Sequence, residues 1–103
     1  MVNFYIPANS SISINNLTGD EGVRRIICYA SSSSTSNLLY NGNVIGIFSS
    51  NNNINIDFES YYGFPKLSDL AIEIAPNVSV VILVDVVPYS DTTDNYIEIR
   101  SVS

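Results

Sequence analysis

Residues 70–87 read LAIEIAPNVSVVILVDVV, and this stretch decides the fold class. In residues 70–74 every second side chain is large and apolar, and the same holds for residues 78–87. Residues 75–77 separate the two halves with a proline and an asparagine. Because successive side chains of a β-strand point to opposite faces, this alternation predicts two strands joined by a turn.

The strand predicted at residues 78–87 is apolar on more than one face. One face consists of valine and isoleucine throughout, whereas the other runs from Ser79 through Val81 and Leu83 to Asp85. A strand with two apolar faces lies either between two sheets or between its own core and a partner subunit. Val81 and Leu83 are therefore candidate interface residues.

Most of the other hydrophobic segments alternate in the same way. They are rich in β-branched and aromatic residues, which suit a half-buried pleated surface. Alternation covers residues 2–6, 12–14, 54–59 and 97–100, and an apolar run covers residues 23–30. Asn41 and Gly42 stand between two further apolar runs, the strongest short signal for a hairpin with a type I′ turn.

These segments together predict an all-β protein. About eight strands at such short spacing indicate an antiparallel β-sandwich, either jelly-roll-like or Ig-like. Polar breaks rich in glycine, proline or asparagine are expected to form the turns, at residues 18–22, 49–53, 75–77 and 88–95.

The serine-rich stretch ASSSSTSN at residues 30–37 raises the question of a domain boundary. A split there would leave an N-terminal piece of about 30 residues, and pieces below about 40 residues seldom hold a core unaided. Cys28 is the single cysteine and there is no histidine, so neither a disulfide nor a histidine-based metal site can supply a cross-link. We therefore predict one domain, residues 1–103, in which the serines form a flexible end loop. That loop is expected to be solvent-exposed or ordered against a neighbouring subunit.

The net charge of −6 argues against nucleic acid and anionic membranes as partners. The four basic residues are too few and too scattered to neutralise a phosphate backbone: Arg24, Arg25, Lys66 and Arg100. The chain opens without a basic, apolar secretory leader. Its longest apolar run is far below the ~20 residues of a membrane-spanning helix. We expect synthesis in the cytoplasm.

The residues required by most catalytic sites are missing. Without histidine there is no Ser-His or Cys-His pair, and a Ser-Lys pair would need Lys66, which no suitable motif accompanies. Cys28 lies in an apolar run and is expected to be a small buried hydrophobe. No glycine-rich phosphate loop is present. We expect a non-enzymatic protein without a cofactor.

Acidic side chains offer two further chemistries. Asp57 with Glu59, and Asp69 with Glu73, are spaced to share a strand face, as a glycosidase pair would require. Their places on polar strand faces favour ordinary solvated surface instead. Residues 91–95 carry oxygen ligands but lack the spacing of an EF-hand loop, so a solvated turn is favoured over a Ca²⁺ site.

One aromatic cluster, Tyr61, Tyr62 and Phe64, falls at a predicted strand end. It fits a hydrophobic plug that closes one end of the sandwich. It also fits a subunit interface, where tyrosine and phenylalanine are enriched, or a platform that stacks against sugars. The absence of tryptophan favours the interface over the sugar platform.

Three segments carry a resemblance to a known group of proteins. These are FYIPANSSISI at residues 4–14, FPKLSDLAIEIA at residues 64–75, and VSVVILVDV at residues 78–86. Their order, with a polar Ser/Thr/Asn-rich face, resembles small β-sandwich proteins of tailed-bacteriophage virions, namely head decoration (cement) proteins and small tail or fibre modules. The sequence departs at residues 75–77, where such proteins often have Gly-Asp.

The resemblance implies a structural protein of the virion that binds capsid or tail proteins as a homo-oligomer, with a trimer favoured. It transfers no individual site residue. A different class remains open, a carbohydrate-binding or adhesive module that would use Tyr61, Tyr62 or the asparagine-rich loops.

Overall fold

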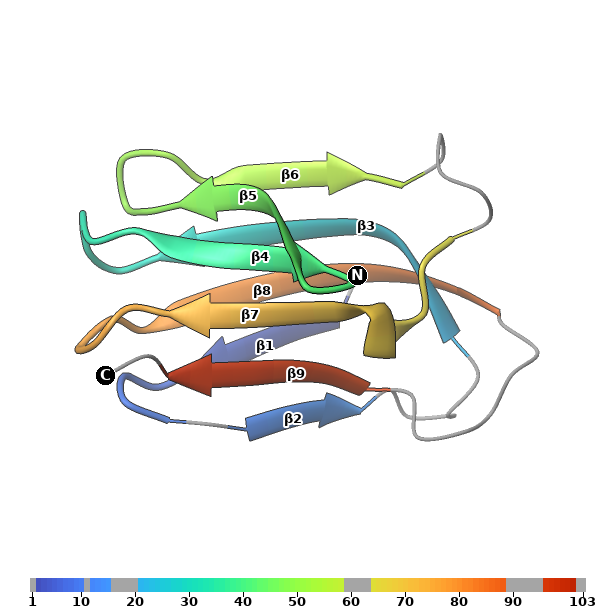
Figure 1. The fold of residues 1–103 in the computed structure, drawn as a ribbon, viewed down its shortest axis with the longest axis horizontal. Helices are drawn as coiled ribbons and strands as arrows, with labels where there is room; N and C mark the ends of the chain where they lie inside the picture. Colours follow the sequence, from blue (N-terminus) through green and yellow to red (C-terminus); the bar gives the residue numbers. More distant parts are fainter. Residues whose placement is uncertain (1, 11, 16–20, 59–63, 89–95, 102–103) are drawn as a thin grey trace.

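A computed structural model describes residues 2–10, 12–15, 21–58, 64–88 and 96–101 (Figure 1). Within these ranges the chain forms nine strands and one short 3-10 helix. Their bounds are β1 Val2–Ile6, β2 Ile12–Asn15, β3 Glu21–Ala30, β4 Ser36–Tyr40, β5 Asn43–Phe48, β6 Ile54–Asp57, η1 Leu67–Asp69, β7 Leu70–Ile74, β8 Val80–Pro88 and β9 Tyr96–Ser101. The prediction of an all-β sandwich is confirmed.

The strands form two sheets that pack face to face. The first sheet has the order β1-β8-β3-β6, and the second has the order β2-β9-β7-β4-β5. In Figure 1, strands β3, β8 and β1 of the first sheet lie behind β4, β7 and β9 of the second. Each sheet buries one face against the other, as the period-two pattern requires.

Apart from one inserted strand, the strand order is that of a jelly roll, one of the two predicted alternatives. In that fold a chain of eight strands rolls up so that the first pairs with the last, the third with the sixth and the fourth with the fifth. Here β1 pairs with β8, β3 with β6 and β4 with β5. The remaining pair, β2 and β7, is separated by β9, which is antiparallel to β2 and parallel to β7. The other pairings between described strands are antiparallel.

A single hydrophobic cluster fills the space between the sheets. In β7 the buried residues alternate with half-buried ones, and β8 contributes Val80, Ile82 and Val84 to the same core. Cys28 is fully buried within this cluster, as expected. Burial of each large aliphatic side chain of the core, such as Ile82, contributes about 1.5–3 kcal/mol to the stability of the fold.

Two local features shape the hairpin formed by β4 and β5. Asn41 and Gly42 both have positive φ, 49° and 82°, which confirms the type I′ turn between β4 and β5. A bulge then shifts the register of β5, because Leu38 pairs with Gly46 but Leu39 pairs with Val44.

Some predicted boundaries differ from the structure. Strand β3 begins at Glu21, inside the turn expected at residues 18–22, and β8 begins at Val80 rather than at Val78. Asp69 ends the helix η1 and so does not share a strand face with Glu73. The carboxylate oxygen Oδ2 of Asp69 accepts a hydrogen bond from the backbone N–H of Lys66 at 2.9 Å, which fixes this turn.

The predicted end loop is present between β3 and β4. Four described loops gather at the left end of Figure 1, residues 7–10, 31–35, 49–53 and 75–79, and the serine run supplies the second of them. We refer to these four loops as the Ser/Asn end.

Candidate interaction surfaces

An exposed row of apolar side chains crosses three strands of the first sheet. Tyr5 of β1 pairs with Val81 of β8, and Val81 pairs on its other side with Tyr29 of β3. Paired residues of an antiparallel ladder point to the same face, and here it is the face turned away from the core. The exposed fractions are 65% for Tyr5, 36% for Val81 and 43% for Tyr29.

The next row continues this surface. Leu83 of β8 pairs with Ile27 of β3, and both side chains are half-buried. Asn3 of β1 and Asn55 of β6 flank them at the two edges of the sheet. We refer to the outward side chains of these two rows as the apolar face: Tyr5, Ile27, Tyr29, Val81 and Leu83.

Among the described residues of this surface, charge first appears in the third row. Arg25 pairs with Asp85 on one side and with Asp57 on the other. Its guanidinium Nη2 lies 3.3 Å from Oδ2 of Asp57, and both side chains are more than 40% exposed. An ion pair this exposed adds at most about 1 kcal/mol of stability. It does, however, mark where the apolar face ends.

The first row also borders the Ser/Asn end, where two loops are joined by a pair of asparagines. The backbone N–H of Asn77 donates to Oδ1 of Asn9 at 2.9 Å, and Nδ2 of Asn9 donates to Oδ1 of Asn77 at 3.0 Å. Both residues have positive φ, 60° and 63°, which asparagine tolerates better than most residues. The loop after β1 is thereby tied to the loop before β8.

Serines connect the remaining loops at this end. Ser31 and Ser79 bond reciprocally, because the N–H of Ser31 donates to the carbonyl of Ser79 and the N–H of Ser79 donates to Oγ of Ser31. The N–H of Ser50 donates to the carbonyl of Ser32 at 2.8 Å. The predicted serine loop is largely exposed and is held by bonds within its own chain.

The four loops of the Ser/Asn end contain no Asp, Glu, Lys or Arg. Their side chains are hydroxyls, amides and small apolar groups. A protein of net charge −6 thus carries an uncharged surface that runs from these loops onto the apolar face. Such a surface suits contact with uncharged or apolar partners.

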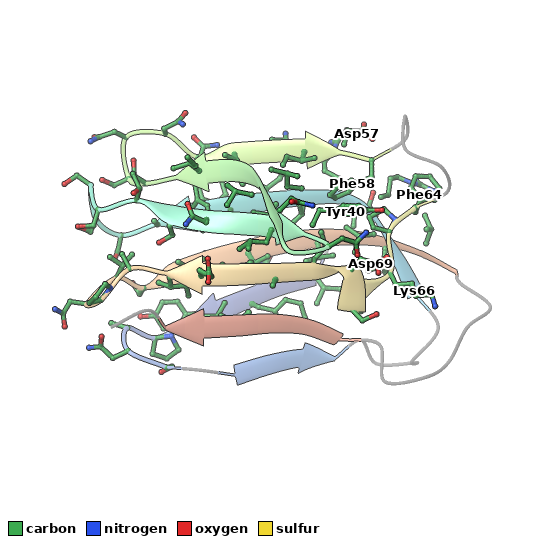
Figure 2. The ribbon with its side chains drawn as sticks, in the orientation of Figure 1. Tyr40, Asp57, Phe58, Phe64, Lys66 and Asp69 are labelled. Carbon is green, nitrogen blue, oxygen red and sulfur yellow. The ribbon has the colours of Figure 1, made fainter. Side chains whose placement is uncertain are left out.

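The opposite end of the sandwich is aromatic and charged (Figure 2). Tyr40 stacks on the buried Phe58 with ring centroids 6.4 Å apart. Phe64 packs half-buried against the core, and the guanidinium of Arg24 lies 5.9 Å from the centre of its ring. This distance is within the range of a cation–π contact.

The structure separates the predicted interface residues. Val81 and Leu83 lie on the apolar face, whereas Phe64 lies at the aromatic end. Tyr61 and Tyr62 lie outside the described residues. Tyr5, Ile27 and Tyr29 were missed as site residues, although the alternation at residues 2–6 already placed Tyr5 on the outward side of its strand.

The described residues offer little that resembles reactive chemistry. Burial raises the pKa of the Cys28 thiol to about 12, so the thiolate nucleophile is suppressed. No group of three or more potential metal ligands occurs in the part of the chain that the structure describes. Asp57 forms an ion pair with Arg25, and Asp69 accepts from the backbone N–H of Lys66. Glu59 and residues 91–95 lie outside the described residues.

Compared with known proteins, the chain matches no family model, no curated protein and no solved structure. Among the described residues, no helix has the length and apolarity needed to cross a membrane.

Proposed function

We propose that this chain is a non-enzymatic virion structural protein that decorates a capsid lattice as a homo-oligomer. The observation that carries the proposal is the apolar face, whose residues are not part of the hydrophobic core cluster of the described chain. The sequence resemblance to small phage virion proteins gives this surface its biological setting.

The apolar face has the composition of an interface. Tyrosine is enriched at protein interfaces because its ring buries a large area while its hydroxyl keeps a hydrogen-bond partner. Two exposed tyrosines flank Val81 here, and no charge interrupts the two rows. Burial against a capsid protein or a second copy would remove apolar surface from water without stranding a charge.

The test is association with virus particles. We expect the protein to sediment with purified particles from its source, and genes for capsid, portal or tail proteins to lie beside its own. Replacing Tyr29 and Val81 together by serine is expected to reduce the bound fraction at least tenfold. Replacing Val44 and Ile47 by serine is the control, because these exposed residues lie on β5 of the second sheet.

A soluble protein that is strictly monomeric and never sediments with particles would contradict the proposal. So would a bound fraction that falls equally with both pairs of substitutions.

A second candidate, a carbohydrate-binding module, is supported by the position of Tyr5 and Tyr29 beside the uncharged Ser/Asn end. The two tyrosines are two strands apart, about 10 Å at the usual strand spacing. Rings so placed are suited to stack on every second sugar of an extended glycan, and neighbouring hydroxyls and amides can bond the sugar hydroxyl groups. A glycan array tests this candidate. Binding of a neutral glycan that is lost on Tyr29→Ala supports it, and a blank array removes it.

A further inference from the structure

We infer that two copies of this chain join through β1, edge to edge and antiparallel, so that their first sheets form one continuous eight-stranded sheet. The inference rests on the proposed homo-oligomer and names its contact. It replaces the trimer that the sequence resemblance implies with a two-fold assembly.

Strand β1 is the least protected of the four strands at the sheet edges. An edge strand presents unpaired backbone donors and acceptors, and proteins guard such edges with short length, bulges or charges. Strands β2 and β6 have four residues each, and β6 ends in Asp57. Strand β5 is interrupted by the bulge at Ile45. Strand β1 has five residues, Val-Asn-Phe-Tyr-Ile, with an unbroken register to β8 and no charge or proline.

The charge distribution favours this edge for contact between identical chains. Two molecules of net charge −6 repel each other, so they approach most easily where neither carries charge. The apolar face and the adjoining Ser/Asn end are both uncharged, and both reach β1. The opposite edge of the same sheet carries both charges of the Arg25–Asp57 ion pair, and the side chain of Asp57 is 44% exposed.

The pairing would also join the two apolar faces. Tyr5, the most exposed large hydrophobic side chain described, lies at the β1 edge on the outward face. A two-fold axis beside Phe4, the middle residue of β1, sets Tyr5 of each copy opposite Asn3 of the other. Two apolar faces then become one surface, and the outward row gains a cross-strand neighbour at each Tyr5.

Light scattering after size exclusion tests the assembly. We expect a mass twice the 11.3 kDa of the chain. The double substitution Asn3→Lys with Tyr5→Lys sets lysines directly opposite each other at two places in the pair. It is expected to raise the dissociation constant of the dimer about tenfold or more, because like charges in this position repel.

The matched control is Val44→Lys with Ile47→Lys. It adds the same charge at two exposed positions on the edge strand β5 of the other sheet. We expect this control to remain dimeric. A monomer or a trimer for the native chain overturns the inference, and so does equal weakening by the two double substitutions.

Cross-linking tests the contact even if the lysine variant does not fold. Cys28 is buried with a raised pKa, so engineered surface thiols react selectively. A mixture of Asn3→Cys and Tyr5→Cys chains, treated with a short bis-maleimide, is expected to give cross-linked dimers. Asn55→Cys at the opposite edge is expected to give none. Cross-linking at Asn55 alone would overturn the assignment to β1.

The outcome separates this inference from the proposed function. A β1-linked dimer that never associates with particles keeps the inference and removes the virion role. Particle association by a chain that does not cross-link through β1 keeps the virion role and removes the inference.

Discussion

At the scale of single residues, Gly46 marks a point where the two sheets approach each other closely. A Cβ atom built on it would lie 2.8 Å from Cδ1 of Ile54 and 3.4 Å from Cδ1 of Ile56, both on β6 of the opposite sheet. The bulge in β5 sets this register, since Leu38 pairs with Gly46. The small residue leaves the space that the isoleucines of β6 fill.

A double-mutant cycle measures this fit. We expect Gly46→Ala to destabilise the protein by about 1 kcal/mol, the low end for an extra methyl group in a filled space, because the atom it meets is the end of the Ile54 side chain. Ile54→Val removes the Cδ1 methyl that the new Cβ would meet. The double variant is therefore expected to be more stable than the sum of the single effects predicts, by about 0.5–2 kcal/mol in urea unfolding. Strict additivity would show that Ile54 is not the obstacle.

Cys28 makes stability depend on pH in the alkaline range. Its pKa is about 12 in the folded protein against 9.0 for the free group, so the folded state holds the proton more tightly. The stability that this pKa difference contributes is complete below pH 9 and is lost as pH rises toward 12. Above pH 9 the free energy of unfolding is expected to fall faster than in Cys28→Ala, by about 1.4 kcal/mol per pH unit. Parallel curves of the free energy of unfolding against pH for the two proteins would contradict this expectation.

Individual elements follow the sequence pattern closely. Alternation predicted β1, β2, β6, β7 and β9, and the Asn-Gly pair predicted the tight turn between β4 and β5 because both positions need positive φ. The pattern could not place the bulges, since these depend on how β3 and β5 fit neighbours far away in the chain. For the same reason the sequence indicated Val81 and Leu83 but not the partners that complete their rows. Those partners come from β1 and β3, and their register is set only when the sheet assembles.

The loop after β1 offers a test at the scale of an element. Asn9→Gly keeps the positive φ available but removes both side-chain hydrogen bonds to Asn77. We expect a loss of about 1 kcal/mol beyond that of Asn41→Gly. Asn41 also has positive φ, and it bonds through its backbone, donating its N–H to Asp69 and accepting from Asn43 at its carbonyl oxygen. Hydrogen exchange at the Asn77 amide is the second measurement, and faster exchange is expected only in Asn9→Gly. Unchanged exchange would mean that this bond does not join the loops.

The whole molecule is asymmetric from end to end. Neutral serine and asparagine loops are bonded to one another at one end, and aromatic and charged side chains gather at the other. The first sheet presents the apolar face, and in the second sheet β9 lies between β2 and β7. These features arise from which strands become neighbours, which the alternation in each strand does not specify.

Deleting residues 96–103 tests the importance of β9. In the described structure β2 pairs with β9 alone, and Ile99 is fully buried in the core. We expect the shortened chain to lose its cooperative thermal transition and its dispersed NMR spectrum. The full chain is the control. A cooperative transition in the shortened chain would mean that β2 can close onto β7, as in an eight-stranded jelly roll.

The position of β9 also bears on how this chain is made. A ribosome that has synthesised the chain as far as Pro88 has made the residues of eight strands, yet the strand that fills the gap between β2 and β7 is still missing. Ile12 must wait for Ile99 before it gains its backbone partner. Folding of the second sheet is therefore expected to finish only after translation has passed β9, and the nascent chain carries an open sheet until then.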